Sequence, residues 1–469
     1  MRLLILLHRY LGMIIGVVIV LWCLSGFVMM YVQYPEYSRA EQLADLEPLE
    51  VGSCCVLPED WSDEFRFLNA QVESYLGSPV LRITSGREFW TIDLTSGQLI
   101  ESIDETVALS VVERLVEEPV IYRGQLERDQ WTVAGGYDAH RPLYHFAVQD
   151  EANAEWYVSG TTGQLILGTT GTERFWNWLG SVIHWIYPTE LRRNVGAWSQ
   201  IVIWLSIAGT FLTVTGLYVG IARYRRGKAS PYRGWLLWHH YLGLVFGLFT
   251  LTWMVSGLLS MTPYGALAGR DFSPERENIR GGELTFGRVT SKLVLLDQDL
   301  IPAGTVRLTS SMFAGHFAWI AWNASGNSAR LGPALTNAHL LTHAVAVRPQ
   351  VAIQSQSLID EPDAYYYSHH DARSFPVFRI QYEDGDRLYL DAVSGDLISA
   401  VDSGRRWSRW LFHALHRGDF AEWARQRPTW DIFMFVLMAG VTLGSFTGAY
   451  LGLKRMTRSA KINSRFARY

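Results

Sequence analysis

The chain has 469 residues, of which 49% are hydrophobic and 18% are charged, and its formal net charge is −4. This composition is too apolar for an ordinary soluble protein of this length and too polar for membrane spans alone. The three cysteines are too few for a thiolate-bound iron–sulfur centre or a disulfide framework. The sequence therefore predicts a membrane protein with large domains outside the bilayer.

Four uncharged stretches, each long enough to cross about 30 Å of hydrocarbon as a helix, divide the chain. We assign the predicted transmembrane helices to residues 1–33, 195–222, 235–262 and 430–453. Two long inserts, 34–172 and 263–404, separate the first span from the second and the third from the fourth. Residues 173–194 and 405–429 are aromatic, amphipathic segments, which we expect to form interfacial helices.

Basic residues gather at one end of the predicted spans. Arg2 and Arg9 flank the first span, and the loop 223–234 and the tail 454–469 carry the others. If the spans alternate in direction, these clusters share one side, which the positive-inside rule assigns to the cytoplasm. Both termini are then cytoplasmic and both inserts lie outside. The basic residues of the loop and tail are Arg223, Arg225, Arg226, Lys228, Arg233, Lys454, Arg455, Arg458, Lys461, Arg465 and Arg468.

The inserts have the patterns of α+β domains. Residues 80–84 and 89–93 are typical of strands, and 105–118 has the apolar spacing of a helix. Cys54 and Cys55 are adjacent, which leaves a free pair, a strained bridge or a mixed disulfide open. We expect one domain per insert. A phrase with a Ser-Gly or Thr-Gly turn, expected to join two strands, occurs at 93–100, 159–166 and 391–398.

The second half of the chain repeats the first, histidines included. His-Arg-Tyr-Leu-Gly at 8–12 returns as His-His-Tyr-Leu-Gly at 239–243, and Thr-Gly-Leu-Tyr-Val-Gly at 215–220 returns as Thr-Gly-Ala-Tyr-Leu-Gly at 447–452. Because each half crosses the membrane an even number of times, the repeats are parallel. We therefore expect an α-helical four-span bundle built from two parallel repeats, with two α+β domains outside. The same offsets pair Trp22 with Trp253, Ser25 with Ser256, Gly26 with Gly257, Trp178 with Trp410 and His184 with His416.

The turn phrase, a small polar residue or Asp followed by Thr/Ser-Gly-x-Leu-Ile, resembles the PepSY repeat. With the His-Arg-Tyr-Leu-Gly helix start and the Trp-Leu-x-x-x-x-His helix, the chain resembles PepSY-associated transmembrane proteins over nearly its full length. Within that group it is similar to the di-haem ferric-siderophore reductases of the bacterial inner membrane. The resemblance implies two b-type haems, histidine ligands, PepSY-like periplasmic domains and electron transfer outward across the inner membrane.

Two pairs of repeated histidines are the candidate axial ligands of haem iron. His8 and His239 begin the first and third spans, and His184 and His416 precede the second and fourth. A single interfacial histidine is more often a lipid headgroup contact, but its repetition in both halves favours a ligand pair. Two imidazoles fill both axial positions, which favours electron transfer over ligand binding. The alternates are His240, which aligns with Arg9, and His413, one turn from His416; His240 could also serve a propionate.

Other side chains could assist the haems. Gly12, Gly16, Gly243 and Gly247 lie one and two turns from the first histidine pair, where small residues let a flat macrocycle approach. Arg9, Arg174 and Arg406 could pair with haem propionates through forked hydrogen bonds, although each could equally contact a lipid headgroup.

The remaining histidines give weaker signals. His339 and His343 have the spacing of two metal ligands on a helix, but no third ligand is evident. The segment 369–371, His-His-Asp, and the pair His140 and His145 could contact iron or substrate, and are more often polar loop residues.

The chain has no dinucleotide fingerprint or phosphate loop, and its cytoplasmic segments are too short for a flavin domain. Electrons would therefore come from a cytoplasmic protein, a free reduced flavin or the quinol pool. The resemblance implies a ferric siderophore, or another periplasmic acceptor, as the electron acceptor. Reduction to Fe(II) weakens binding by hard oxygen ligands and would release the iron. The alternative is a non-redox PepSY protein that regulates or binds a peptidase. No basic patch suggests nucleic acid, and spans without midplane charges argue against a transporter.

Overall fold

The computed structural model describes residues 1–51, 54–224, 230–368 and 373–466, with side chains as far as residue 457. The chain forms two compact units. The helical unit comprises Met1–Tyr34, Thr172–Ala268 and the chain from Gly404 onward; the sheet unit comprises Pro35–Gly171 and Gly269–Ser403. Some residues noted in the sequence lie outside the described part: Arg225, Arg226, Lys228, His369, His370, Asp371 and the side chains of Arg458, Lys461, Arg465 and Arg468.

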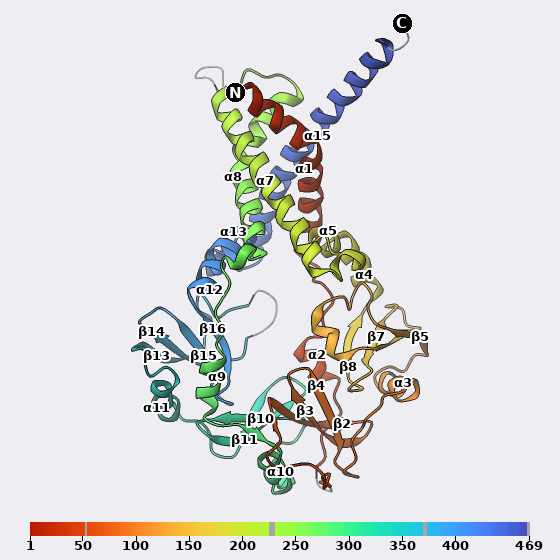
Figure 1. The fold of residues 1–469 in the computed structure, drawn as a ribbon, viewed down its shortest axis with the longest axis vertical. Helices are drawn as coiled ribbons and strands as arrows, with labels where there is room; N and C mark the ends of the chain where they lie inside the picture. Colours follow the sequence, from red (N-terminus) through yellow and green to blue (C-terminus); the bar gives the residue numbers. More distant parts are fainter. Residues whose placement is uncertain (52–53, 225–229, 369–372, 467–469) are drawn as a thin grey trace. The chain divides into compact units, whose positions relative to one another are not determined.

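Four long helices form the helical unit: α1 (Arg2–Met29), α7 (Val195–Arg223), α8 (Trp235–Ser260) and α15 (Thr429–Phe466). Each is long and apolar enough to span a membrane, α15 through its part Thr429–Thr457, which confirms the predicted four-span membrane protein. They pack side by side, as Figure 1 shows. Apolar side chains such as Ile14, Trp204 and Leu248 face outward, as expected for helices surrounded by lipid rather than water.

The interior of the helical bundle is a small apolar core. Ile15, Ile19, Cys23, Leu212, Met254 and Val441 are buried there. Cys23 is free and packs as the small apolar residue that the sequence predicts. The helix α15 continues well into the segment predicted as a basic tail, because its Lys, Arg, Met and Ala residues are good helix formers and nothing breaks it.

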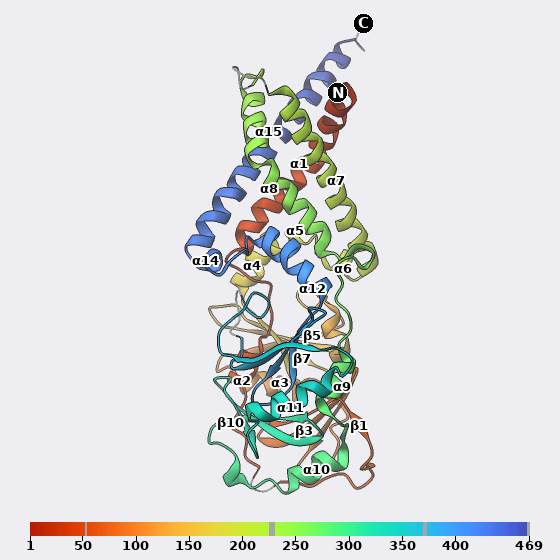
Figure 2. The ribbon, with the colours of Figure 1, turned by 90° about the vertical axis from the view of Figure 1, so that its left-hand side faces the viewer.

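Each predicted interfacial helix is a series of short helices, visible in Figure 2. Gly180 separates the first two members of the first series, and Pro188 precedes the third. In the second series the turn Arg409–Ala414, here η4, is a π-helix, a form frequent at functional sites. Gly418 has φ of +71° and ends α13, since that conformation favours glycine. The members are α4 (Gly171–Leu179), α5 (Ser181–His184), α6 (Thr189–Arg192), α12 (Ser403–Ser408), η4, α13 (Leu415–Arg417) and α14 (Glu422–Arg425).

The sheet unit holds three antiparallel sheets of four or more strands and one small two-stranded sheet, β1-β9, among the described residues. The central sheet has the order β12-β11-β10-β2-β3-β4, and the other two have the orders β5-β6-β7-β8 and β13-β14-β15-β16. The strands are β1 (Arg66–Phe67), β2 (Asn69–Tyr75), β3 (Ser78–Ser85), β4 (Glu88–Asp93), β5 (Val120–Leu126), β6 (Leu143–Val148), β7 (Glu155–Ser159), β8 (Leu165–Thr169), β9 (Leu284–Thr285), β10 (Thr305–Phe313), β11 (His316–Asn323), β12 (Ser328–Leu331), β13 (Ile353–Ile359), β14 (Val377–Tyr382), β15 (Arg387–Asp391) and β16 (Leu397–Val401).

The central sheet belongs to both inserts, which differs from the expected one domain per insert. Strand β2 of the first insert pairs antiparallel with β10 of the second, Val72 opposite Leu308. Without this pairing, one edge of β2 and one edge of β10 would lack a partner, and joining these edges satisfies both. The two inserts therefore fold as one unit.

Short helices surround the sheets, and several begin at side-chain caps. Asp104 caps α3, which ends at Glu113, earlier than the predicted 105–118; Thr285 caps α10 and Thr336 caps α11. A side-chain oxygen at this position satisfies an otherwise unpaired backbone N–H of the first turn. These helices are α2 (Arg39–Ala44), α3 (Glu105–Glu113), α9 (Ser273–Arg280), α10 (Phe286–Val294), α11 (Asn337–Val347) and the 3₁₀ turns η1 (Gly135–His140) and η3 (Gln298–Leu300). A further 3₁₀ turn, η2 (Pro263–Gly265), follows α8 in the helical unit.

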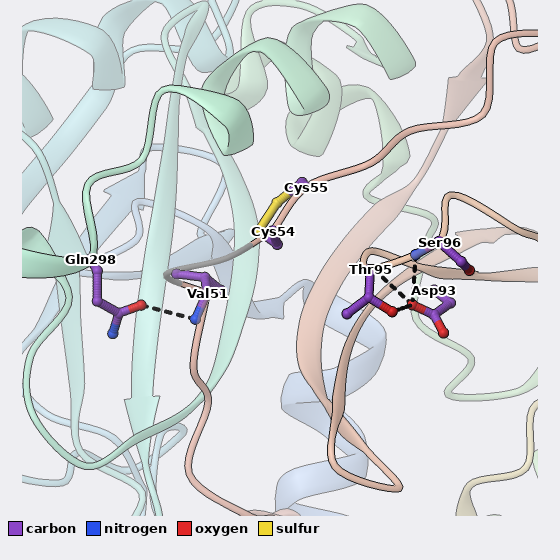
Figure 3. The surroundings of a disulfide bond; sticks show 7 residues. All are labelled: Val51, Cys54, Cys55, Asp93, Thr95, Ser96 and Gln298. Atoms are coloured by element: carbon purple, nitrogen blue, oxygen red, sulfur yellow. Dashed lines mark hydrogen bonds between the residues drawn. A yellow bond between two sulfur atoms is a disulfide. The ribbon is translucent and has the colours of Figure 1, made fainter.

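The three turn phrases form tight turns at strand ends. The second joins β7 to β8 and the third joins β15 to β16, as predicted, while after β4 only an isolated bridge from Ile92 to Leu99 forms. In the first phrase a side-chain oxygen of Asp93 accepts hydrogen bonds from the backbone N–H groups of Thr95 and Ser96 (Figure 3). The turn glycines Gly97, Gly163 and Gly395 all have positive φ, which explains why the phrase contains glycine.

Cys54 and Cys55 form a disulfide bond, one of the three states that the sequence leaves open (Figure 3). Both residues pack against the core of the central sheet. The nearby Val51 backbone N–H donates to the Gln298 side chain, so this segment of the first insert is bonded to the second insert.

A buried carboxylate links the central sheet to the turn between β7 and β8. Glu73 on β2 is 2% exposed and accepts hydrogen bonds from Arg82 at 2.6 Å and from Arg307 at 2.8 Å. Gln164 of the second turn phrase also donates to Glu73, and Arg82 donates to the carbonyl of Thr162. Burial alone would raise the pKa of Glu73, but the two guanidinium groups outweigh it and lower the pKa below its ordinary value.

Replacing Glu73 with glutamine should destabilise the sheet unit strongly. Glu73→Gln leaves Arg82 and Arg307 without their buried counter-charge, which typically costs about 3–5 kcal/mol. The measurement is the midpoint of thermal unfolding of the purified protein. The matched control, Glu283→Gln, breaks the exposed pair with Arg66 and should change stability by less than about 1 kcal/mol.

The contribution of Glu73 should also depend on pH. Because its pKa is lowered in the folded protein, the stabilisation is complete above the unfolded-state pKa of about 4.3 and declines as the pH falls through the lower folded-state pKa. The difference in stability between the natural protein and Glu73→Gln should therefore shrink in strong acid. An unchanged difference there would contradict the assignment of this carboxylate as charged.

Candidate functional site

The first histidine pair, His8 and His239, meets inside the bundle. The rings come from α1 and α8, and their centres are 6.2 Å apart. The Nδ1 atom of His8 lies 3.0 Å from the carbonyl oxygen of Leu212, and Nδ1 of His239 lies 3.0 Å from that of Gly444. A carbonyl only accepts, so each ring donates from Nδ1 and leaves an unprotonated Nε2. This is the arrangement in which histidine binds a metal.

Two glycines of the repeated Thr-Gly-x-Tyr-x-Gly motif hold these rings. A Cβ atom added to Gly216 would lie 2.5 Å from Cε1 of His8, and one added to Gly448 would lie 2.7 Å from Cε1 of His239. Both distances are shorter than any ordinary contact. The motif on α7 and α15 therefore places each imidazole directly against the backbone of the neighbouring helix.

A cavity of about 880 Å³ adjoins the first pair. His8, His239 and the predicted glycines Gly12, Gly16, Gly243 and Gly247 all line it. A Cβ atom at Gly243 would meet no atom within 4 Å, so this wall of the cavity is open space. Four cationic residues also line the cavity: Arg9, Arg223, Lys454 and Arg455.

The second histidine pair, His184 and His416, lies on the short helices α5 and α13, with ring centres 6.1 Å apart. Nδ1 of His184 lies 3.0 Å from the carbonyl of Trp22 and 3.2 Å from Oγ of Ser25. His416 repeats these contacts with the backbone of Trp253 and with Oγ of Ser256, the latter at 3.0 Å. Both histidines thus hydrogen-bond a carbonyl and a serine hydroxyl near the end of a long helix.

The alternates are less suited to binding a metal. Both ring nitrogens of His240 are engaged, Nδ1 with the hydroxyl of Ser230 and Nε2 with the carbonyl of Gly220, each at 2.9 Å. His413 packs beside Phe412, whereas the ring of His416 is the one that lies opposite His184.

The predicted propionate contacts divide into two groups. Arg9 lines the cavity, while Arg174 on α4 and Arg406 on α12 are not among the described residues that do so. Arg223, Lys454 and Arg455 line it as well, although in the sequence they indicate only the orientation of the spans. In the sequence, these three residues follow the two Thr-Gly-x-Tyr-x-Gly motifs by about one helical turn. That position could have indicated that they lie near the histidine pair.

His339 and His343 make hydrogen bonds within the sheet unit. His339 caps α11 by accepting from the backbone of Thr336, and His343 donates from Nε2 toward the carbonyls of Asn278 and Ile279. In the part of the chain that the structure describes, no group of three metal-binding side chains occurs.

His140 and His145 both lie in the sheet unit, and each contacts a different set of side chains. His140 stacks on Phe89, and His145 stacks on Tyr157 with Nε2 at 3.2 Å from Glu155. Local packing and hydrogen bonds account for both rings.

The two histidine pairs fit a metal ion held between two imidazoles. Metal–imidazole bonds of about 2 Å, extended through each ring to its centre, separate the two centres by roughly 6 Å. The observed 6.2 and 6.1 Å agree with this value. The open cavity and its cationic residues suit a flat, dianionic macrocycle beside the first pair. The residues present therefore fit a bis-histidine haem.

The comparisons with known proteins identify the family. The family model described as the PepSY-associated TM region matches residues 5–455, a range that includes all four long helices up to Arg455 and all four paired histidines. No curated protein matches the chain. Because the family model covers nearly the whole sequence, the chain belongs to the family of the PepSY-associated TM region.

Proposed function

We propose that this chain is a di-haem protein of the bacterial inner membrane that transfers electrons from the cytoplasmic side to a periplasmic acceptor. The observation that carries the proposal is the spacing of the two histidine pairs, with ring centres 6.2 and 6.1 Å apart and the Nδ1 atom of each ring hydrogen-bonded to a neighbouring helix. A haem with two imidazole ligands supplies one-electron chemistry and has no open position for a substrate.

In this proposal His8 and His239 hold one b-type haem, and His184 and His416 hold the other. Arg9, Arg223, Lys454 and Arg455 neutralise the propionates of the first through charge-assisted hydrogen bonds. Arg174 and Arg406, on helices next to the second pair, remain the candidates for the second haem.

The two sites would lie near opposite faces of the membrane. His8 is close to the start of α1, while the carbonyl that holds His184 belongs to Trp22 on the same helix. A helix rises 1.5 Å per residue, so the two levels are roughly 20 Å apart, most of the hydrocarbon thickness. The basic flanks of the spans support a cytoplasmic position for the first pair and a periplasmic one for the sheet unit.

The proposed acceptor is a ferric siderophore, taken up from the periplasmic side. Hard oxygen ligands bind Fe(II) less tightly than Fe(III), so one electron per iron releases the metal. The donor is a cytoplasmic reductant or the membrane quinol.

The histidine variants should separate the two haems. His8→Ala and His239→Ala should each lose the same haem, and His184→Ala and His416→Ala the other, because each haem needs one ligand from each half. Haem extraction should give two haems per chain for the natural protein and one for each variant. His240→Ala is the matched control and should keep both, since its ring nitrogens are engaged elsewhere. A colourless, fully folded natural protein would refute the proposal in favour of a non-redox role.

Replacing Gly216 or Gly448 with alanine should displace the rings of the first histidine pair and leave the second pair in place. Gly216→Ala and Gly448→Ala push the rings of His8 and His239 from their positions, so haem content should fall toward one per chain. Gly196→Ala, also on α7, is the control, because its Cβ would meet its nearest neighbour at 3.7 Å. Equal haem content in all three variants would show that the glycines do not set the ring positions.

Electrons should pass from a donor on the cytoplasmic face to an acceptor on the periplasmic face. In oriented membrane vesicles, a ferric siderophore on the periplasmic face should reoxidise chemically reduced protein. His239→Ala should still be reoxidised through its remaining haem, yet fail to turn over with a donor on the cytoplasmic face. Absorbance of the reduced haem measures both steps. A reduced protein that no ferric chelate reoxidises would exclude iron as the substrate while leaving electron transfer to another acceptor.

A further inference from the structure

The four paired histidines share one feature that the proposed function does not use. In each case the backbone carbonyl that hydrogen-bonds the ring also accepts a hydrogen bond from a Ser or Thr hydroxyl three residues further along the helix. For His8 the carbonyl is that of Leu212, and the hydroxyl of Thr215 lies 2.9 Å from it. For His239 the carbonyl is that of Gly444, and the hydroxyl of Thr447 lies 2.8 Å from it.

The second pair has the same arrangement. The hydroxyl of Ser25 donates to the Trp22 carbonyl at 3.0 Å, beside Nδ1 of His184. The hydroxyl of Ser256 donates to the Trp253 carbonyl at 3.2 Å, beside Nδ1 of His416. Ser25 and Ser256 are 1% and 0% exposed, so no water competes for these groups.

Hydroxyls elsewhere in the same helices bond the backbone without a histidine. Thr210 donates to the carbonyl of Ser206, four residues back, and Ser260 donates to that of Gly257, three residues back. Such bonds are the usual way for Ser and Thr to satisfy a hydroxyl inside a membrane helix. The recurrence of a shared carbonyl at all four histidines is therefore a property of the histidine sites.

We propose that Ser25, Thr215, Ser256 and Thr447 are positioning residues that set the reduction potentials of the two haems. The inference rests on the proposed function, because it requires haem at both pairs. A strong hydrogen bond from Nδ1 gives the imidazole more anionic character, which stabilises Fe(III) and lowers the potential. A hydroxyl bound to the same carbonyl weakens that carbonyl as an acceptor for the ring. The hydroxyl therefore moderates the ligand and raises the potential.

Thr215 gives the clearest test. At the other three sites the hydroxyl oxygen also lies 3.0–3.3 Å from Nδ1 itself, so its removal has two effects on the ring. Among the described residues, the hydroxyl of Thr215 hydrogen-bonds the carbonyls of Leu212 and Phe211 and not the ring of His8. In Thr215→Val the Leu212 carbonyl loses the hydrogen bond from the hydroxyl and keeps the one from His8, and the potential of the first haem should fall.

The experiment is a redox titration of the purified two-haem protein, followed by the absorbance of the reduced haems. At a fixed applied potential near the midpoint, Thr215→Val should raise the ferric-to-ferrous ratio of one haem by roughly threefold to tenfold, consistent with a change in one hydrogen bond. The other haem should titrate as in the natural protein. Thr215→Ser restores the hydroxyl and should restore the ratio.

Matched controls separate tuning from general disturbance of the helices. Thr210→Val removes a hydroxyl from the same helix, and Ser260→Ala removes one from α8; both should leave both potentials unchanged. Ser256→Ala should shift the haem that Thr215→Val does not. If Thr215→Val loses haem, Thr215→Ala removes the same hydroxyl without a branched side chain and is titrated instead.

The outcomes distinguish the two proposals. A natural protein without haem overturns the proposed function and this inference with it. A protein with two haems whose potentials are unchanged in Thr215→Val and Ser256→Ala overturns the inference alone. The inference is also overturned if Thr215→Val and Thr210→Val shift the reduction potentials of both haems by equal amounts. The hydroxyls would then act only through a general effect on the helix.

Discussion

The bond between a buried imidazole and a helix carbonyl is the interaction on which the helical unit depends. A histidine ring placed among apolar helices must satisfy its nitrogens, and an unsatisfied polar atom there is costly. Each of the four paired rings hydrogen-bonds a backbone carbonyl of a long helix, and the ring centres within each pair lie 6.2 and 6.1 Å apart. The crossing of the helices, the glycines of the repeated motif and the short helices before α7 and α15 all follow from the need to bring these atoms together.

The same constraint explains the pattern of small residues. His8 and His239 reach their carbonyls only because Gly216 and Gly448 have no side chain, whereas Gly26 and Gly257 make ordinary contacts with the second pair. Glycine in a membrane helix weakens the helix locally, but it allows a ring to lie against the backbone. In the Thr-Gly-x-Tyr-x-Gly motif, the threonine therefore supplies a hydroxyl and the adjacent glycine leaves the space that one imidazole ring needs.

Much of the helical unit could be predicted from the sequence, because the relevant signals are local. Runs of apolar residues predict the four long helices, and the recurrence of His8 as His239 and of His184 as His416 predicts which rings meet. The repeat also pairs Ser25 with Ser256, yet only the structure links these hydroxyls to the histidines. Arg223, Lys454 and Arg455 look like orientation signals in the sequence and line the cavity in the structure. The pairing of β2 with β10 could not be predicted, since hydrogen bonds between distant strands carry no local pattern.

The shared central sheet has a consequence for biosynthesis. Arg307 binds Glu73 across 234 residues of sequence, and β10 pairs with β2 over the same separation. When the ribosome has finished the first insert, the open edge of β2 has no partner, and Glu73 has only one of its two arginines, Arg82. Two further membrane helices must be made and inserted before β10 exists. During that interval the exposed strand is a site for aggregation or for a chaperone, and folding of the sheet unit completes only after the third helix is in the membrane.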